Sequence, residues 1–74
     1  MEVEILDTLG LKCPQPLHKL ALKVADMNRG DILEVFGDCP RFEDHIRMWC
    51  DRVGKLILSV RDDGAERRWI KIQL

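Results

Sequence analysis

Apolar and polar side chains alternate along four short segments of the chain, as is typical of strands in a half-buried sheet. The four predicted strands are Val3–Asp7, Ile32–Phe36, Leu56–Val60 and Trp69–Leu74. We expect the second strand to be largely buried, and one face of the fourth to carry Ile70, Ile72 and Leu74. The Asp-Asp-Gly sequence at residues 62–64 predicts a turn, so that the last two strands form a β-hairpin.

Two longer segments place apolar side chains three or four residues apart, which predicts two amphipathic helices. The first follows a loop over residues 9–16, and its apolar face consists of Leu17, Leu20, Ala21, Val24 and Met27. The apolar face of the second consists of Phe42, Ile46, Trp49, Cys50 and Val53. Asp38, Cys39 and Pro40 are expected to open the second helix, and Gly54 is expected to end it.

The predicted elements follow one another as strand, helix, strand, helix, strand, strand. A strand, a helix and a parallel strand form a crossover that is right-handed in nearly all proteins, so we expect both helices on one face of a four-stranded mixed sheet. The predicted class is an α/β fold of the α+β two-layer sandwich type, with residues 1–74 forming one domain. If the first two strands are parallel, both helices begin at the same edge of the sheet, where Cys13 and Cys39 would lie.

Composition and charge argue against several classes of function. The chain has 12 basic and 13 acidic residues and a formal net charge of −1, which favours neither a general nucleic-acid binder nor an acidic tail. The two Phe and two Trp residues are mostly assigned to apolar faces, which leaves little for a base-stacking surface. No apolar run reaches the length of a membrane span, and residues 1–7 lack the features of a signal peptide, so we expect a cytoplasmic protein.

The three cysteines, Cys13, Cys39 and Cys50, form no C-x-x-C motif. Their odd number fits a reducing compartment better than a disulfide framework, and the missing motif argues against a thioredoxin-type dithiol and against half of a zinc ribbon. Cys50 lies on the apolar face of the second helix beside Trp49. We therefore expect Cys50 to be buried as a small hydrophobic residue.

The segment GLKCPQPLHKL (residues 10–20) contains the strongest candidate for chemistry, Cys13. Pro14 and Pro16 restrict the backbone and belong in the first turn of a helix, which predicts a rigid helix start next to Cys13. Unpaired N–H groups and the positive end of the helix dipole favour a thiolate there, and Lys12 is a candidate second stabiliser. The alternative is a rigid loop in which Cys13 is an incidental apolar residue. The position of Cys13 off the apolar face favours an exposed, activated thiol.

Cys39 also precedes a proline between a predicted strand and a predicted helix. Three roles are open for it: a second activated thiol, a resolving partner for Cys13, or a tolerated substitute in a helix cap where Asp38 is the true cap. The capping role is favoured. His18 could act on Cys13 as a base, although a histidine one turn into a helix is more often a solvated surface residue.

The sequence LDTLGLKCPQPLHKL (residues 6–20) resembles the TusA/SirA-type sulfur-carrier family, which is marked by a Cys-Pro-x-Pro motif near the N-terminus. The resemblance continues through Gly30 and Asp31 before the second strand, the Asp-x-Pro pattern at residues 38–40 and the closing hairpin, so it covers essentially the whole chain. It implies a four-stranded mixed sheet with two helices packed on one face, similar to the C-terminal domain of a bacterial translation initiation factor.

The resemblance also implies a chemistry for Cys13. This residue would accept sulfane sulfur as a persulfide from a cysteine desulfurase or a rhodanese-like donor and pass it to an acceptor protein. Such relays serve tRNA thiolation, cofactor synthesis or sulfur metabolism, and the protein would be a sulfurtransferase-type carrier rather than a stand-alone enzyme. Pro14 and Pro16 would fix the loop. We expect no metal or organic cofactor, no membrane partner, no direct nucleic-acid partner and a monomer.

One position departs from the family pattern. Where many relatives resemble Asp-Asp-Pro before the second helix, this chain reads Asp38, Cys39, Pro40. If Cys39 approaches Cys13, sulfur could be released internally by disulfide formation, or the pair could act as a redox lock. Two alternatives to the carrier therefore stay open: a regulatory or nucleic-acid-binding module, and a thiol–disulfide redox protein that uses Cys13 and Cys39.

Overall fold

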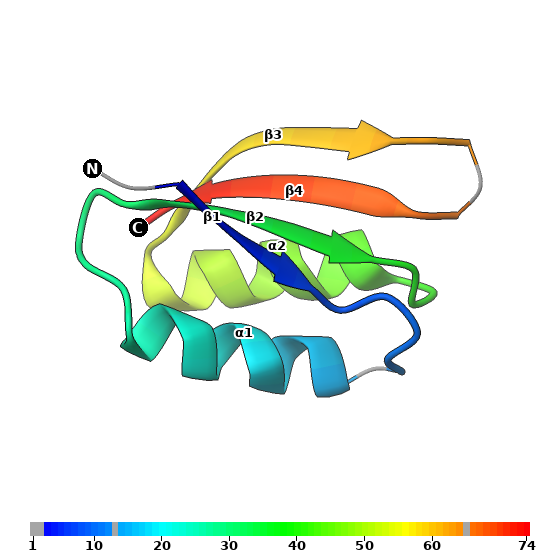
Figure 1. Cartoon of the computed structure of the whole chain (residues 1–74), viewed down its shortest axis with the longest axis horizontal. Helices are drawn as coiled ribbons and strands as arrows, with labels where there is room; N and C mark the ends of the chain where they lie inside the picture. The colour runs from blue at the N-terminus through cyan, green and yellow to red at the C-terminus, as the bar shows by residue number, and fades with distance from the viewer. Residues whose placement is uncertain (1–2, 13, 65) are drawn as a thin grey trace.

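The computed structural model describes residues 3–12, 14–64 and 66–74. In it, a four-stranded sheet forms one layer and two helices form the other (Figure 1). The elements are β1 (Val3–Asp7), α1 (Gln15–Ala25), β2 (Ile32–Gly37), α2 (Phe42–Val53), β3 (Leu56–Asp62) and β4 (Arg68–Gln73). The predicted order of elements and the predicted two-layer class are confirmed.

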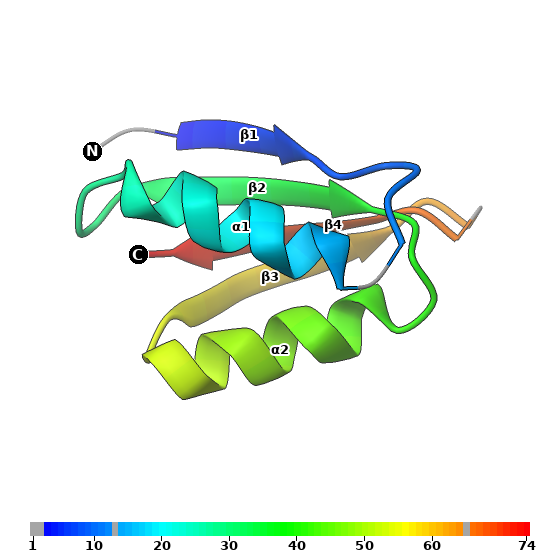
Figure 2. The same cartoon turned by 90° about the horizontal axis from the view of Figure 1, so that it is seen from below.

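The sheet has the strand order β1-β2-β4-β3. β1 pairs with β2 in parallel, with Val3 opposite Ile32, and the other two pairings are antiparallel. Because β1 and β2 run in the same direction and each leads into a helix, α1 and α2 begin at the same edge of the sheet (Figure 2). The connections that contain the sequence-predicted site residues therefore lie at one end of the molecule.

The core lies between the helices and one face of the sheet. Its fully or nearly fully buried apolar members are Leu20, Leu33, Val35, Cys39, Phe42, Ile46, Cys50, Ile70 and Ile72. Burying a side chain of this size contributes about 1.5–3 kcal/mol, so this layer provides most of the driving force for folding. The prediction that Ile70 and Ile72 share the buried face of β4 is confirmed.

The other face of the sheet remains open in the part of the chain that the structure describes. Buried and half-buried residues alternate along β2, so the prediction of a largely buried strand holds for only one of its faces. Phe36 on β2 and Trp69 on β4 lie half-buried on the open face, in edge-to-face contact with their ring centroids 5.4 Å apart. The expectation that the aromatic residues are mostly taken up by buried apolar faces therefore does not hold for these two.

The apolar faces of the helices are narrower than predicted. Leu17, Val24 and Met27 pack against the core as expected. Ala21 is exposed because it lies one residue, or about 100° of helix rotation, beyond the buried Leu20. Val53 is exposed because it is the last residue of α2, where the chain turns towards β3. Both assignments to the core were wrong.

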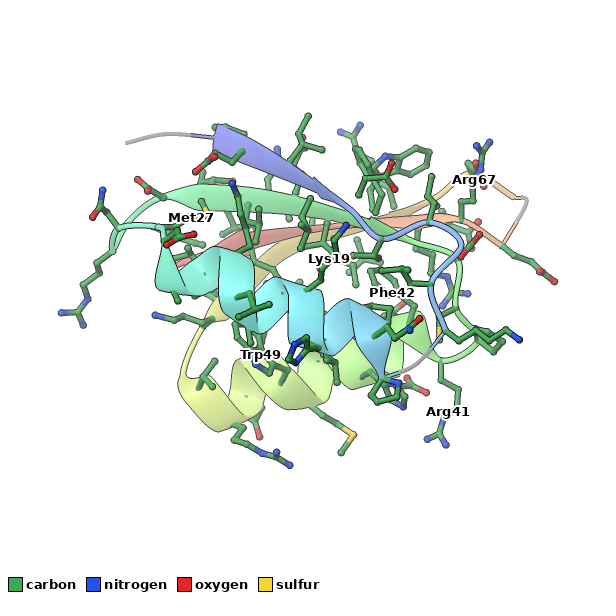
Figure 3. The ribbon with its side chains drawn as sticks, turned by 60° about the horizontal axis from the view of Figure 1, so that its bottom comes forward. Lys19, Met27, Arg41, Phe42, Trp49 and Arg67 are labelled. Carbon is green, nitrogen blue, oxygen red and sulfur yellow. The ribbon has the colours of Figure 1, made fainter. Side chains whose placement is uncertain are left out.

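The start of α2 is fixed by a close contact between a glycine and an aromatic ring. Phe42, the first residue of α2, is buried beneath the end of β2 (Figure 3). A side chain at Gly37 would overlap this ring, so the backbone of Gly37 leaves the space that Phe42 fills. The contact sets the path of the four residues between β2 and α2.

Candidate functional site at two strand-to-helix junctions

Two connections at the common sheet edge form the candidate site. The first junction, residues 8–14, joins β1 to α1, and the second junction, residues 38–41, joins β2 to α2. Cys13, the predicted nucleophile, lies outside the described residues. The structure therefore constrains the site through the residues on either side of Cys13 and through the second junction.

The first junction is tied to the end of β2. The buried Thr8 donates two hydrogen bonds to the carbonyl oxygen of Phe36, one from its backbone N–H at 2.8 Å and one from its hydroxyl. The N–H of Leu11 in turn donates to the carbonyl of Thr8 at 3.2 Å. Because the partners are backbone groups of the sheet, the path of the junction is held by the fold itself.

Lys12 and Gln15, which lie before and after Cys13 in the sequence, form two hydrogen bonds with each other. The Gln15 N–H donates to the Lys12 carbonyl oxygen at 2.8 Å, and the Lys12 N–H donates to the Gln15 side-chain oxygen at 3.2 Å. This arrangement resembles a capping box. Pro14 occupies the cap position of α1, and Pro16 is buried in the first turn, so both prolines lie where the sequence predicted them.

The first-turn amides of α1 are not free, contrary to the sequence-based expectation. The Gln15 N–H is bonded to Lys12, the Leu17 N–H donates to the Pro14 carbonyl at 3.1 Å, and Pro16 has no N–H. An anion at this helix start would therefore be favoured by the helix dipole and by the exposed Lys12, not by unpaired amides. No acidic residue lies in the first turn of α1 to oppose that effect.

The second junction turns before α2 begins. The Phe42 N–H donates to the Cys39 carbonyl at 3.0 Å, and Arg41 takes the cap position in the left-handed region, with a φ of 67°. The prediction that Asp38 caps the helix with Cys39 beside it is wrong. Asp38 instead accepts a hydrogen bond from the Gly10 N–H at 3.0 Å, which joins the two junctions.

Cys39 is 8% exposed, and its Sγ lies 3.1 Å from the Pro40 carbonyl oxygen. Cys39 is disulfide-bonded, whereas Cys50 is a free, buried thiol. Burial raises the pKa of Cys50 to about 11, so that thiol stays protonated near neutral pH. The predicted role of Cys50 as a small buried hydrophobic residue is confirmed.

An open pocket of about 560 Å³ lies between the two junctions. Its lining residues are Gly10, Leu11, Lys12, Asp38, Cys39 and Pro40. A second hollow of about 190 Å³ adjoins it, in which Cys39 lies together with Arg41 and with Arg68 of β4. The structure thus brings two sequence-predicted residues, Lys12 and Cys39, to the same pocket.

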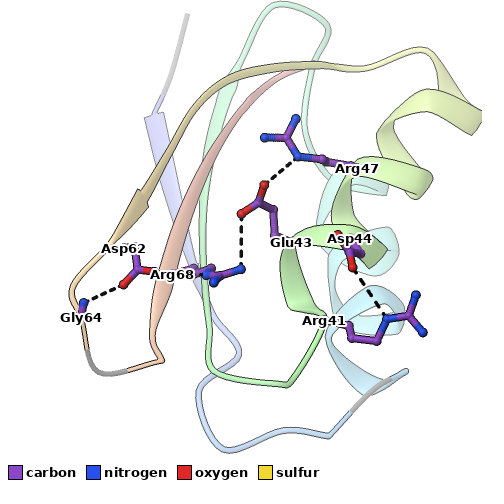
Figure 4. Close-up of polar contacts among 7 residues, drawn as sticks. All are labelled: Arg41, Glu43, Asp44, Arg47, Asp62, Gly64 and Arg68. Carbon is purple, nitrogen blue, oxygen red and sulfur yellow. Dashed lines mark hydrogen bonds and ion pairs between the residues drawn. The ribbon is translucent and has the colours of Figure 1, made fainter.

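The first turn of α2 carries a network of ion pairs (Figure 4). Glu43 contacts Arg47 at 2.8 Å and Arg68 at 3.3 Å, and Asp44 contacts Arg41 at 3.7 Å. The carboxylates of Glu43 and Asp44 offset the positive end of the α2 dipole. The sequence gave no sign that Arg68 links β4 to α2.

A groove of about 300 Å³ between α1 and α2 adjoins the first junction. Its lining residues are Pro14, Leu17, His45, Met48, Trp49 and Arg52. Met48 is 59% exposed, so the groove offers apolar surface to solvent. Its members come from two separate helices, and sequence spacing therefore did not reveal it. His18, the candidate base, is exposed on α1.

The fold and the site together define a class: a small two-layer α/β fold in which a cysteine precedes a proline-fixed helix start. The family model described as Sulfurtransferase TusA matches residues 4–73. The chain belongs to the TusA sulfurtransferase family, as the sequence resemblance indicated. In the part of the chain that the structure describes, no helix has the length and apolar character needed to cross a membrane.

Proteins named as sulfur carriers are similar to nearly all of this chain. A protein of Aquifex aeolicus named "Putative sulfur carrier protein" is 34% identical over 71 residues, which are 95% of this chain and 36% of that protein. The "Putative sulfur carrier protein YedF" of Escherichia coli K12 is 31% identical over 65 residues, 88% of this chain and 84% of its own length. The protein of the same name from Salmonella typhimurium LT2 has the same identity, 31% over 65 residues, and the same coverage. This chain thus spans about a third of the Aquifex protein.

Proposed function

We propose that this protein is a sulfur carrier that accepts sulfane sulfur as a persulfide on Cys13 and relays it to an acceptor protein. The observation that carries the proposal is the charge at the start of α1, where Lys12 is exposed and the first turn has no acidic residue. Such a site favours a sulfur anion over a thiol. Membership of the TusA sulfurtransferase family and the names of the relatives support the same function.

The loading step is a thiol–persulfide exchange. The Cys13 thiolate attacks the outer sulfur of the donor persulfide, the S–S bond of the donor breaks, and the donor cysteine leaves as a thiolate. In the unloading step, an acceptor thiolate attacks the outer sulfur on Cys13, and the Cys13 thiolate leaves. Neither step needs an oxidant or a cofactor, so the protein acts as a sulfurtransferase-type carrier.

Donor and acceptor would bind directly beside the cysteine. The donor class we propose is a cysteine desulfurase or a rhodanese-like protein, because both carry sulfur as a cysteine persulfide. The apolar groove that adjoins Pro14, with its exposed Met48, supports docking next to Cys13. A bound partner there would also shield the persulfide from solvent.

Intact-mass measurement after incubation with free cysteine and a cysteine desulfurase tests the proposal. We expect the wild-type protein to gain the mass of one sulfur atom, which a reductant removes, and we expect Cys13→Ser to gain none. Cys50→Ala is the matched control, because Cys50 is buried with a raised pKa and should not affect loading. Loading that is equal in Cys13→Ser and wild type would contradict the proposal.

The receiving pathway is tested by following labelled sulfur. We propose an acceptor protein in tRNA thiolation, cofactor synthesis or sulfur metabolism. The protein is first loaded with labelled sulfur and is then incubated with candidate acceptor proteins. The label should move to a cysteine of one of these acceptors. RNA or DNA binding that persists at physiological salt and survives Cys13→Ala would instead favour the alternative of a nucleic-acid-binding module.

A further inference from the structure

We propose that Cys39 is a resolving thiol that discharges the Cys13 persulfide by releasing sulfide. The inference rests on the proposed persulfide function of Cys13. The Cys39 thiolate attacks the Cys13 sulfur, the bond between that sulfur and the outer sulfur breaks, and the outer sulfur leaves as hydrosulfide. The product is a disulfide between Cys13 and Cys39, which cannot accept another persulfide sulfur until it is reduced.

The electrons in this step balance without an external oxidant. The outer, sulfane sulfur takes the electron pair of the broken bond and is reduced to sulfide. The two cysteine sulfurs are together oxidised to a disulfide. A dithiol or a low-molecular-weight thiol then reduces the disulfide and restores the carrier. The reverse step, in which hydrosulfide attacks the Cys13 sulfur of the disulfide, forms the Cys13 persulfide directly.

A hydrogen bond between the two junctions limits how far apart Cys13 and Cys39 can lie. The Gly10 N–H is bonded to the Asp38 carboxylate, and Asp38 immediately precedes Cys39. Cys13 follows Gly10 by three residues, a stretch that spans at most about 11 Å when fully extended. Lys12, the residue before Cys13 in the sequence, lines the same pocket as Cys39. A disulfide requires Cα atoms within about 7 Å, and this arrangement is compatible with that limit.

The state of the described cysteines identifies Cys39 as the one that takes part in disulfide chemistry. Cys39 is disulfide-bonded, whereas Cys50 is free, buried, and has a pKa raised to about 11. Cys39 also lines both hollows of the site, so solvent and small thiols reach its surroundings. Of these two residues, only Cys39 is both disulfide-bonded and part of the site.

Burial and charge at the two helix starts give the two cysteines an order of reactivity. Near Cys39, Arg41 and Arg68 are paired with Asp44 and Glu43, so these charges largely cancel, and burial to 8% exposure disfavours the Cys39 thiolate. The first turn of α1 has no acidic residue, and Lys12 is exposed. Cys39 should therefore form a thiolate less readily than Cys13. A less ionised Cys39 attacks more slowly, so a docked acceptor can remove the sulfur before internal discharge occurs.

The test follows a loaded protein after the donor is removed. Wild type, Cys39→Ser and Cys50→Ala are loaded with persulfide, and released sulfide is measured alongside the intact mass without reductant. We expect wild type and Cys50→Ala to release one sulfide per molecule and to form an intramolecular disulfide. Cys39→Ser should hold its sulfur about tenfold longer or more, because an intramolecular nucleophile is lost. Equal discharge of Cys39→Ser and wild type would overturn the inference.

A second arm separates this inference from the carrier function. Oxidised protein is digested to map its disulfide, and is then treated with hydrosulfide in the absence of any sulfur donor protein. We expect the digest to show a Cys13–Cys39 disulfide. We also expect hydrosulfide to convert this disulfide into a persulfide on Cys13. Absence of that disulfide overturns the inference even if donor-dependent loading is normal. Failure of donor-dependent loading, with the disulfide and the hydrosulfide reaction intact, contradicts only the proposed relay.

Discussion

The two junctions share a Cys-Pro dipeptide, a strand before it and a helix after it, yet they differ in charge and packing. The first is followed by a helical turn without acidic residues, and Lys12 lies exposed beside its cysteine. The second is followed by Glu43 and Asp44, and its Cys39 is almost fully buried. The comparison teaches that the same dipeptide can stand in two different electrostatic and packing environments. We therefore expect the two cysteines to differ in reactivity.

The junctions also differ in what holds them. Backbone bonds from Thr8 and the reciprocal bonds between Lys12 and Gln15 fix the first. Side-chain packing of Phe42 against Gly37 fixes the second. Mutations of buried side chains should therefore affect the second junction more than the first, and the four predictions below test this difference from the largest effect to the smallest.

Phe42→Ala should produce the largest loss of stability. Removing a buried aromatic side chain leaves a cavity, and such changes cost about 3–5 kcal/mol of unfolding free energy. Denaturant unfolding followed by circular dichroism measures the loss. Met48→Ala, at an exposed position of the same helix, is the control and should change the free energy by less than about 0.5 kcal/mol. Equal effects of the two variants would show that Phe42 does not anchor the second junction.

Gly37→Ala should have the next largest effect. The added methyl group meets the Phe42 ring, and overpacking of this kind costs about 1–3 kcal/mol. The same unfolding measurement applies. The double variant Gly37→Ala, Phe42→Ala should be less destabilised than the sum of the two single variants, because the alanine fills part of the space that the ring vacates. Strict additivity would argue against a direct contact.

The carboxylate that joins the junctions is tested by Asp38→Ala. The variant loses the hydrogen bond from the Gly10 N–H, which at this exposed site is worth about 0.5–1.5 kcal/mol of unfolding free energy. We also expect slower sulfide release from the loaded protein, because the junctions are no longer held together. Asp38→Asn keeps an acceptor oxygen and should largely restore the rate. If Asp38→Ala discharged as fast as wild type, the link would have no part in the resolving step.

Gln15→Glu should give the smallest effect of the four variants, a change in the pKa of Cys13. The Gln15 side-chain oxygen accepts a hydrogen bond from the Lys12 N–H, and a carboxylate can accept the same bond while adding a negative charge. That charge offsets the α1 dipole, an effect worth about 0.3–1 kcal/mol, and should raise the pKa of Cys13. The pH dependence of alkylation in a Cys39→Ser background measures it. A pKa that stays the same or falls would contradict the electrostatic account of the first junction.

Much of the fold could be predicted because its signals are local. The alternation in the strands, the apolar helix faces and the prolines near Cys13 gave the element order and the edge at which both helices begin. The start of α2 was missed because it depends on Phe42 filling the space above Gly37, and no local pattern encodes that contact. The sequence analysis assumed that the first N–H groups of a helix are unpaired. It therefore missed that the Gln15 N–H at the start of α1 is bonded to Lys12.

The links between the junctions could not be read from the sequence for a similar reason. Thr8 and Phe36 are 28 residues apart, as are Gly10 and Asp38. Their contacts arise only after β1 and β2 have paired in parallel with a defined register. The pocket that includes Cys39 follows from that pairing, so its members became visible together only in the folded structure.

The two tryptophans lie in separate environments, which gives the protein two built-in fluorescence reporters. Trp49 lines the groove beside Pro14, whereas Trp69 lies against Phe36 on the opposite face of the sheet. A protein that docks on the groove should change the emission of Trp49 and leave that of Trp69 unchanged. The single-tryptophan forms Trp49→Phe and Trp69→Phe would therefore report where a partner binds without any added label.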